Sequence, residues 1–539
     1  MATSPFPPSG ESATDLAGEP RRVLRDVFGY DAFRPGQETV IATVLEGRDC
    51  IAVMPTGAGK SLTYQIPARL LDGTVLVVSP LISLMKDQVD ALEDLGFRAT
   101  AINSSLGLDE WRRRVAALRA GAYELVYLAP EALDGALRDA IRDAPIVLLA
   151  VDEAHCISQW GHDFRPAYRR LSGLKGELGV PVLALTATAT RRVARDILVQ
   201  LGMRRPGGHK GSFFRQNLRI YARKKGEGDT RREILALVRS HAGESGIVYC
   251  MSRRAADATA AFLERRGVRA LPYHAGMADA DRAASQEAFQ RDEADVIVAT
   301  VAFGMGIDKS NVRFVIHRDM PKDVESWYQE IGRSGRDGLP AECVIFYSWA
   351  DVKLHERFLR DIPDAALRRE KQRATVRLFE LLEAGRCRHR AILAHFDEAI
   401  EDCGSACDVC TGVAGAALAA RAIDATATAA RGGARATRGY GGVATGLVDA
   451  RAPGGSAGAP EPSAADERVF ERLRSLRKRL AEDRGVPAYI VFNDRTLLEM
   501  AARRPATPAD MLAIQGVGPA KLERYGDAFL DAIADGPAP

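Results

Sequence analysis

The residues best suited to chemistry begin with a glycine-rich segment, MPTGAGKS, at positions 54–61. It follows a β-branched run and precedes a helix-forming one, so its two inner glycines can turn backbone amides toward a phosphate. Lys60 would reach the outer phosphates of a nucleotide, and Ser61 would bind its magnesium ion. Met54 stands where the usual pattern has its first glycine, so these residues alone also fit a surface loop. The segment predicts a phosphate site that needs support from elsewhere in the chain.

Two adjacent carboxylates end a strand-like run further on, in IVLLAVDEAH at positions 146–155. Asp152 can hold magnesium through water, and Glu153 can orient or deprotonate the water that attacks a phosphate. Acids that merely cap a strand are the alternative. It fits less well, because open parallel sheets bind their ligands at the carboxyl ends of strands. Together with the glycine-rich segment, the pair predicts a P-loop ATPase.

A third charged element lies far along the chain, in WYQEIGRSGRDG at positions 327–338. It offers Gln329 and two arginines, Arg333 and Arg336, with glycines around them. A guanidinium that can insert between phosphate oxygens suits phosphoryl transfer. Arginines of this kind more often form a solvated face. Here they follow a second α/β segment, which favours the functional interpretation.

Aromatic residues come directly after the acids, in CISQWGHDFRP at positions 156–166. Trp160 and Phe164 stand beside Arg165, and an exposed aromatic pair next to an arginine is suited to stacking unpaired bases. The alternative is a pair of core side chains. Glycine, histidine, aspartate and proline in the same stretch favour a loop. The segment therefore predicts a surface loop suited to stacking unpaired bases.

Four of the eight cysteines fall in one short window: Cys387, Cys403, Cys407 and Cys410. In a cytosolic chain such clustering favours a metal site over disulfides. Four thiolates at these spacings suit tetrahedral zinc, with His389 or His395 as a substitute for one of them. No position is left open for a substrate, so the zinc is expected to be structural.

Short β-branched runs alternate with amphipathic helical stretches over most of the first 350 residues, which predicts parallel sheets flanked by helices. Two α/β lobes in series are expected, joined at 205–211, where Pro206 and three glycines break any regular element. Between 411 and 465, 19 alanines and 11 glycines among 55 residues predict a flexible linker. The expected divisions are a disordered N-terminus, two lobes, a zinc module, a linker and a helical domain, at residues 1–20, 21–206, 207–350, 351–411, 412–465 and 466–535.

Composition limits the classes of protein to consider. The chain has 539 residues, too many for one core, and its 46% hydrophobic and 27% charged residues are typical of globular proteins. Its net charge of +3 means that a polyanion must be held by local patches. No apolar run approaches the roughly 20 residues that cross a bilayer. The first twenty residues contain acids and no signal-peptide core, so a cytoplasmic chain without membrane contact is expected.

Further motifs extend the pattern: FGYDAFRPGQ (28–37), SPLISLMKDQ (79–88), LTATAT (185–190), YHAGM (273–277) and ATVAFGMGID (299–308). Their order and spacing are similar to those of superfamily 2 helicases. The string AHCISQWGHDFRP is more specific and resembles the RecQ family of DNA helicases. The resemblance covers residues 20–410 and 466–535. It implies two tandem RecA-like P-loop lobes, a helical zinc-binding module and a small all-α HRDC domain.

The resemblance also implies roles for individual residues. The nucleotide would contact Tyr30, Arg34, Gln37, Thr56, Gly57, Ala58, Gly59, Lys60 and Ser61. Turnover would depend on Lys60, Asp152, Glu153, Gln329, Arg333 and Arg336. Within these sets, Tyr30 and Arg34 would sandwich adenine, Gln37 would hydrogen-bond its edge, and Arg336 would act as an arginine finger with Arg333 as its helper.

Two other motifs would carry signals between the sites. Thr186 and Thr188 would link the state of the nucleotide to closure of the lobes. The loop with Trp160, Phe164 and Arg165 would sense single-stranded DNA and signal to the ATPase.

Two features depart from the family pattern. Three residues rather than two separate Cys403 from Cys407, which weakens the assignment of Cys403. RecQ proteins commonly have a winged helix after the zinc module, and residues 411–465 are too short and too rich in alanine and glycine to resemble one. Strand separation by a wing is therefore in doubt.

The stretch 466–535 resembles an HRDC domain. Gly516 and Gly518 precede a helix, where backbone amides can meet a DNA phosphate without reading sequence. A plain turn between helices fits these glycines at least as well. Twelve basic and twelve acidic side chains in this stretch predict modest DNA affinity.

The resemblance implies an ATP-dependent DNA helicase that moves 3′ to 5′ in repair, recombination, replication and the SOS response, with ATP, Mg²⁺ and Zn²⁺. Its expected partners are single-stranded, tailed and forked DNA and a single-strand DNA-binding protein, and the chain is expected to be a nucleoid-associated monomer. One alternative is a translocase that hydrolyses ATP on DNA but unwinds weakly. Another is a DNA-binding scaffold switched by nucleotide, which an intact Glu153 and Arg336 disfavour.

Overall fold

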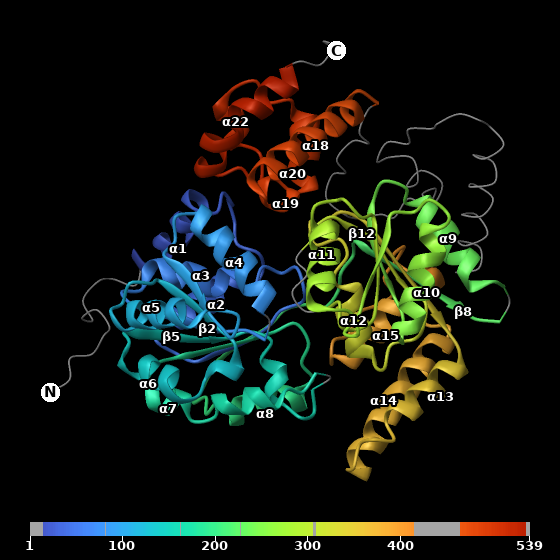
Figure 1. Cartoon of the computed structure of the whole chain (residues 1–539), viewed down its shortest axis with the longest axis horizontal. Helices are drawn as coiled ribbons and strands as arrows, with labels where there is room; N and C mark the ends of the chain where they lie inside the picture. The colour runs from blue at the N-terminus through green and yellow to red at the C-terminus, as the bar shows by residue number, and fades with distance from the viewer. Residues whose placement is uncertain are drawn as a thin grey trace.

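The structure is a computed structural model and describes residues 15–80, 82–161, 163–226, 228–304, 309–413 and 464–534. Two parallel sheets lie side by side, and a helical domain sits over the junction between them (Figure 1). This arrangement confirms the predicted fold class. The winged-helix question and most of the predicted linker fall on residues 414–463, outside the described residues.

Lobe 1 is built on a seven-stranded parallel sheet in the order β3-β4-β2-β5-β6-β1-β7. Its strands are β1 (Cys50–Val53), β2 (Thr74–Val78), β3 (Ala99–Ile102), β4 (Leu125–Leu128), β5 (Ile146–Val151), β6 (Val182–Thr186) and β7 (Gly207–Lys210). Its helices are α1 (Asp15–Asp26), α2 (Gln37–Leu45), α3 (Leu62–Leu70), α4 (Ile82–Asp94), α5 (Leu108–Arg119), α6 (Gly135–Asp143), α7 (Leu174–Leu178) and α8 (Arg191–Gln200), with short 3-10 turns η1 (Pro130–Ala132), η2 (Ala154–Ile157) and η3 (Pro166–Leu171). Strands β2 and β6 are buried along their whole length, which agrees with their continuous apolar sequences.

Lobe 2 is built on a six-stranded parallel sheet in the order β10-β11-β9-β12-β13-β8. Its strands are β8 (Leu218–Lys224), β9 (Ser245–Tyr249), β10 (Ala270–Tyr273), β11 (Val296–Ala299), β12 (Val312–His317) and β13 (Ala341–Tyr347). Its helices are α9 (Thr230–Ser240), α10 (Arg253–Glu264), α11 (Asp279–Gln290) and α12 (Val324–Ile331). The loop that carries Arg333 and Arg336 follows α12 directly.

The expected break between the lobes proves to be a strand. Residues Gly207–Lys210 form β7, which pairs in parallel with β1 and so belongs to the sheet of lobe 1. A Cβ atom at Gly207 would lie 2.7 Å from the Thr43 side chain of α2, so the glycine permits a close approach of helix and strand. The prediction that these glycines interrupt regular structure is therefore wrong. Helix α1 likewise begins at Asp15, inside the segment expected to be disordered.

Helices follow the second sheet and complete the chain. The zinc module consists of α13 (Trp349–Phe358), α14 (Ala365–Glu383), α15 (Arg388–His395) and α16 (Asp408–Thr411), and α13 and α14 project from lobe 2 (Figure 1). The C-terminal domain consists of α18 (Ala464–Arg484), α19 (Ala488–Val491), α20 (Asp494–Arg503), α21 (Pro508–Leu512) and α22 (Pro519–Ala534).

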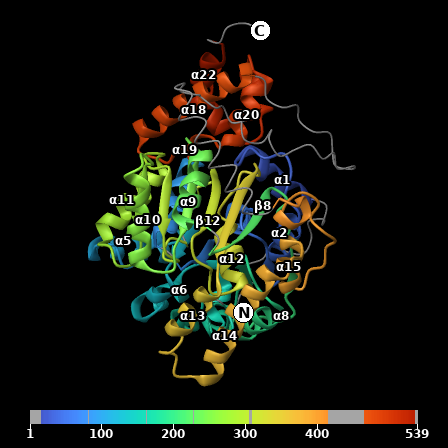
Figure 2. The same cartoon turned by 90° about the vertical axis from the view of Figure 1, so that its right-hand side faces the viewer.

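The C-terminal domain contacts both lobes, as the two views show (Figures 1 and 2). Two of its arginines converge on one carboxylate of lobe 1, with Arg484 Nη2 2.9 Å and Arg524 Nη1 3.0 Å from Asp94 Oδ1. On the other side, Arg474 donates to the carbonyl oxygen of Gly243 in lobe 2 at 2.8 Å. The domain therefore bridges the cleft between the lobes.

Candidate functional site

The glycine-rich loop connects β1 to α3 at the carboxyl edge of the first sheet. Gly57 and Gly59 have φ angles of 83° and 75°, which only glycine adopts without strain. Met54 is buried, and its amide donates to the carbonyl oxygen of Thr186 at 2.9 Å. Methionine can replace the usual glycine here because the position directly follows β1 and its side chain is buried in the hydrophobic core. Lys60 Nζ donates to the carbonyl oxygen of Met54 at 3.2 Å, which holds its charge at the loop.

The two acids follow β5 and line the same cavity as the loop. Burial, assisted by the charge of Glu153 and opposed by that of Lys60, raises the pKa of Asp152 to about 7. Glu153 has a φ of 46°, a strained value for a residue with a side chain and one that recurs at functional sites. A divalent cation beside these acids would offset the burial of their charge, so the donor set fits Mg²⁺.

A series of polar contacts connects Glu153 to lobe 2. His155 Nδ1 lies 3.3 Å from Glu153 Oε2 and 2.9 Å from Thr186 Oγ1. Thr186 Oγ1 donates to the carbonyl oxygen of Thr188 at 3.1 Å. Gln329 Nε2, from α12, donates to Thr188 Oγ1 at 3.1 Å. The chain of contacts runs from an acid of lobe 1 to a side chain of lobe 2.

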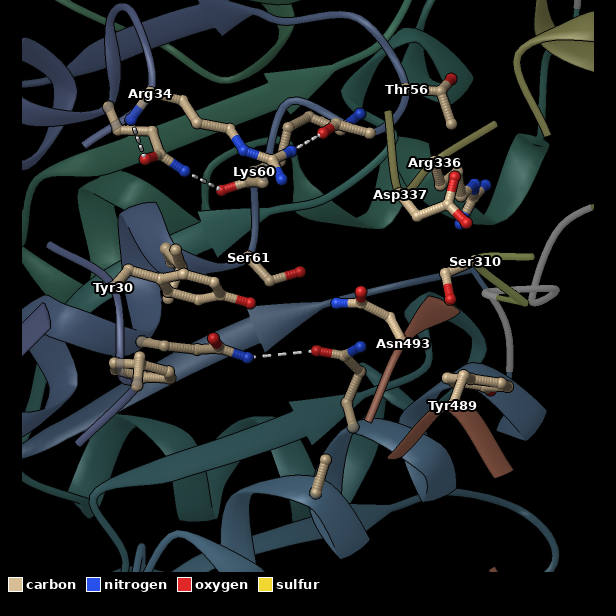
Figure 3. Close-up of a pocket in the computed structure, with 18 of the residues that line it drawn as sticks. Tyr30, Arg34, Thr56, Lys60, Ser61, Ser310, Arg336, Asp337, Tyr489 and Asn493 are labelled. Carbon is tan, nitrogen blue, oxygen red and sulfur yellow. Dashed lines mark hydrogen bonds between the residues drawn. The ribbon is translucent and has the colours of Figure 1, made fainter. Parts of the chain in front are cut away.

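Arg333 and Arg336 line the cavity from the lobe 2 side. The Cα atom of Arg336 lies 3.8 Å from the position that a Cβ atom on Gly57 would occupy, so its loop adjoins the phosphate loop. Arg333 is almost fully buried, and its guanidinium lies beside Gly304. The structure thus brings both predicted arginines to the cavity of the predicted phosphate loop. Figure 3 shows Arg336 there, with Thr56 and Lys60 of that loop.

Arg215 was not predicted, although it joins the two halves of the site. It donates to the carbonyl oxygen of Thr56 at 2.8 Å, and also to those of Ser334 at 3.1 Å and Gly335 at 2.8 Å. Burial lowers the pKa of this guanidinium, and its three carbonyl partners compensate for the lost water. Arg215 stands outside every recognisable motif, so no local pattern identified it.

The three residues expected around adenine lie on the cavity wall. Gln37 Nε2 donates to the carbonyl oxygens of Ala58 at 3.2 Å and Gly59 at 2.9 Å, and its Oε1 accepts from the Arg34 amide at 2.8 Å. Arg34 also donates to the carbonyl oxygen of Gly57. Tyr30 lies at the same end of the cavity (Figure 3). The cavity measures about 510 Å³, a size typical of sites for small ligands and cofactors.

The C-terminal domain closes part of this cavity, which the sequence did not indicate. Tyr489 and Asn493 face it on the side away from Tyr30 (Figure 3). Gly516 lines it as well. Gly518 packs so tightly against lobe 1 that a Cβ atom on Gly29 would lie 2.6 Å from its nitrogen. A DNA phosphate could reach the amide of Gly518 only after this contact opens, and the proposed DNA role of the two glycines stays a prediction.

The aromatic loop lies on the surface. Trp160 is 40% exposed and Phe164 37% exposed, values that do not fit core side chains. Arg165 bonds inward, to Asp163 Oδ2 at 3.2 Å and to the carbonyl oxygen of Pro80 at 3.0 Å. Pro80 belongs to the loop after β2, next to the strand that ends in the acids. The loop therefore presents aromatic side chains at the surface and is anchored beside Asp152 and Glu153.

The four clustered cysteines bring their sulfur atoms within 4.8 Å of one another. The additional residue between Cys403 and Cys407 is accommodated by a turn at Gly404, whose φ is 72°. Hydrogen bonding by the Cys403 thiol lowers the pKa of Cys407 to about 5, which favours a thiolate there. The cluster fits a tetrahedral metal ion with four sulfur ligands.

The two histidines considered as substitute ligands lie elsewhere. His389 Nε2 donates to the carbonyl oxygen of Leu218 at 3.0 Å, and His395 Nε2 lies 2.7 Å from Glu325 Oε1. The alternative with a histidine ligand is therefore wrong, and all four cysteines form the site.

A zinc measurement tests the cluster. Cys410→Ser is expected to retain less than about a tenth of the zinc and to melt at a lower temperature, because structural zinc contributes directly to folding. His395→Gln is the control and should keep one zinc per chain. Metal analysis of both purified proteins gives the result, and full zinc in Cys410→Ser would contradict the four-sulfur site.

No helix among the described residues is both long enough and apolar enough to span a bilayer. The structure of Mycobacterium smegmatis helicase Lhr bound to single-stranded DNA and AMP-PNP has a TM-score of 0.51 at 22% identity, covering 66% of this chain and 50% of that one. Yeast Dbp5 bound to RNA and ADP BeF3 has a TM-score of 0.52 at 16% identity, covering 68% of this chain and all of that one. These similarities support the two-lobe fold.

Models of protein families match four parts of the chain. They are the DEAD/DEAH box helicase (34–197), the helicase conserved C-terminal domain (229–338), the RecQ zinc-binding domain (349–411) and the HRDC domain (466–533). The ATP-dependent DNA helicase RecQ of Haemophilus influenzae is 37% identical, over 95% of each chain. That of Bacillus subtilis is 38% identical over 95% of this chain and 98% of its own. With these matches and the divided site described above, the chain belongs to the RecQ family of ATP-dependent DNA helicases.

Proposed function

We propose that the protein is an ATP-dependent helicase that moves 3′ to 5′ along single-stranded DNA and separates duplexes in DNA repair and recombination. The observation that carries the proposal is the cavity in which the phosphate loop and acids of lobe 1 face Arg333 and Arg336 of lobe 2. A site divided between two lobes can convert loss of the γ-phosphate into movement of one lobe against the other. The direction of movement and the pathway follow from the family alone.

Hydrolysis is assigned to side chains of both lobes. Lys60 and the amides of residues 56–61 would hold the phosphates in the ground state. Glu153 would orient the attacking water and accept its proton. Arg336 would stabilise the charge that develops on the transferred phosphoryl group, with Arg333 and Gln329 in support.

A magnesium ion would neutralise the phosphate oxygens when it is bound. Ser61 and Asp152 would hold it, and both line the cavity. Thr186 and Thr188 would transmit a change at Glu153 to Gln329 and lobe 2, because their hydrogen bonds run from His155, which lies 3.3 Å from Glu153, to Gln329.

The aromatic loop is the proposed DNA sensor. Trp160 and Phe164 offer exposed faces on which unpaired bases can stack, at about 1 to 3 kcal/mol per base. Their anchor, Arg165, lies next to the acids, so a base that moves the loop also disturbs the ATP site. The ATPase would then respond to DNA.

Replacement of the exposed indole tests the sensor. Trp160→Ala is expected to leave basal ATPase intact and to reduce the stimulation by single-stranded DNA about tenfold, as loss of one stacked base predicts. Trp349→Ala, on α13, is the control, since its exposed indole lies outside the loop. ATPase rates with and without DNA decide the result. An equal loss of basal activity would instead indicate a structural tryptophan.

The partners and the site of action are proposed from the same assignment. The substrates would be single-stranded, tailed and forked DNA, with a single-strand DNA-binding protein as a further partner. The protein would work as a monomer in the cytoplasm, on the nucleoid. Gly516 and Gly518 would add weak backbone contacts to DNA once the C-terminal domain leaves the cavity.

Strand displacement tests the function directly. Unwinding should occur on 3′-tailed and forked duplexes and not on 5′-tailed ones, and it should require ATP hydrolysis. Parallel ATPase measurements separate the alternatives. ATPase stimulated by DNA without strand displacement would indicate a weakly unwinding translocase, and DNA binding without hydrolysis would indicate a scaffold.

A further inference from the structure

An arginine stacks on one face of the Trp160 indole. The guanidinium carbon of Arg192 lies 3.3 Å from the centroid of the indole ring, in direct stacking contact. Arg192 belongs to the first turn of α8, which follows Thr188 and its motif in lobe 1. Trp160 is nevertheless 40% exposed, so the cation covers one face of a ring that remains on the surface.

An acid from another module holds this arginine. Arg192 Nη1 donates to Glu370 Oε1 on α14 at 3.1 Å. Both side chains are about half exposed, so each can exchange its partner for water or for a ligand. Helices α8 and α14 lie at the same end of the molecule in both views (Figures 1 and 2). The contact ties the aromatic loop of lobe 1 to the zinc module.

The position of Arg192 runs against the usual charge preference of helices. The N-terminus of a helix is electropositive and favours acidic residues, yet α8 begins with Arg191 and Arg192 and has no acid in its first turn. Each arginine finds an acid of the zinc module instead: Arg191 Nε lies 3.6 Å from Asp397 Oδ2, and Arg192 pairs with Glu370. A local preference overridden in this way is expected where a residue serves function.

We propose that Arg192 is a gate on the DNA sensor: it occupies the Trp160 face when DNA is absent and leaves it for a DNA phosphate when a base stacks there. Glu370 holds the gate closed. The inference rests on the proposed role of Trp160 in base stacking and adds a positioning residue to it. Because the gate opens by breaking the pair with Glu370, arrival of DNA on lobe 1 would also release α14.

The magnitudes permit this exchange. An exposed cation–π contact changes an equilibrium about 2- to 5-fold. An exposed ion pair adds a further factor of at most about 5. One stacked base contributes about 5- to 150-fold, and the freed guanidinium gains a charge-assisted bond to phosphate. DNA therefore displaces the arginine. The gate raises the DNA concentration that is needed for half-maximal stimulation of the ATPase.

Glu370→Gln removes the holding charge and keeps the shape of the side chain. The concentration of single-stranded oligonucleotide that half-maximally stimulates the ATPase is expected to fall about 2- to 5-fold, with basal ATPase unchanged. The matched control is Asp397→Asn, which removes the same charge from the neighbouring pair with Arg191. Asparagine also tolerates the φ of 56° at this position. The control should leave the DNA requirement unchanged.

A second variant keeps the test specific. In an Arg192→Gln background, Glu370→Gln should have no further effect on the DNA requirement, because the gate is already absent. Acrylamide should quench the Trp160 component of fluorescence, obtained by difference from Trp160→Phe, more strongly in Glu370→Gln than in the unaltered protein. Quenching reports exposure of the indole, which a purely structural role of Glu370 would not change.

The remaining outcomes are decisive. The gate is refuted if Glu370→Gln leaves the DNA requirement unchanged or raises it, if Asp397→Asn lowers it equally, or if the effect persists without Arg192. Trp160→Ala separates this failure from that of the sensor. If that variant keeps full stimulation by DNA, the sensor assignment itself is wrong. If it loses stimulation while Glu370→Gln behaves as unaltered protein, only the gate is wrong.

Discussion

Glu153→Gln is expected to reduce ATP turnover by about 10²- to 10⁴-fold while ATP still binds, because the amide cannot accept a proton from water. The carboxylate lies at the end of β5 in a strained backbone conformation and lines the cavity with Lys60. The substitution preserves its shape, so folding should be unaffected. Steady-state ATPase assays and binding of a fluorescent ATP analogue measure the two quantities separately.

Lys60→Ala gives the complementary result. It should abolish turnover and also weaken nucleotide binding strongly, because the proposed role of Lys60 is to contact the phosphates before any chemistry occurs. Glu177→Gln is a suitable control, since Glu177 pairs with Arg138 on the surface and does not line the cavity. Near-normal ATPase in Glu153→Gln would remove the assignment of Glu153 as the base, whatever the result for Lys60.

The parts of the site that could be predicted are those whose residues stand together in short motifs of the sequence. The glycine-rich loop and the acids both follow short buried strands, and parallel strands place their carboxyl ends at one edge of a sheet. Their convergence in one cavity was therefore predictable from the alternation of strands and helices. The tryptophan and phenylalanine after the acids were likewise recognisable as a loop because glycine, aspartate and proline surround them.

The parts that were missed depend on contacts between distant segments. Arg215 resembles any other arginine in the sequence, and only the folded chain shows it bonding to Thr56 and Ser334. Asn493 reaches the ATP cavity because a domain separated by more than four hundred residues from Tyr30 docks there. Net charge and helical periodicity describe that domain alone and say nothing about its docking surface.

Glycine-rich stretches were a second source of error. Gly207 and Gly208 were interpreted as a break, since glycine usually ends regular structure. In the fold they form an edge strand, because β1 supplies the hydrogen bonds and the lack of a side chain lets α2 approach. Local propensity was overridden by a tertiary contact.

Arg336→Ala is expected to lower kcat about 10³-fold or more and to leave nucleotide binding nearly unchanged, because an arginine finger acts on charge that develops only in the transition state. Arg336→Lys should be almost as slow, since an ammonium cannot contact two phosphate oxygens in the planar geometry of a guanidinium. Arg269→Ala is the control; Arg269 pairs with Asp295 at the surface of lobe 2, away from the cavity.

Substitution of Arg215 tests, in the same ATPase assay, a residue that positions the site and does not act on the phosphates. Its hydrogen bonds to Thr56 and to the Ser334–Gly335 backbone fix the loop of Arg336 against the phosphate loop. Without these bonds the two lobes would be held together less closely, so Arg215→Ala should lower both kcat and the stimulation of the ATPase by DNA. External guanidinium should restore more of the activity of Arg336→Ala than of Arg215→Ala, since Arg336 lines the cavity and Arg215 does not. Wild-type kcat in Arg336→Ala would mean that another cation stabilises the transition state.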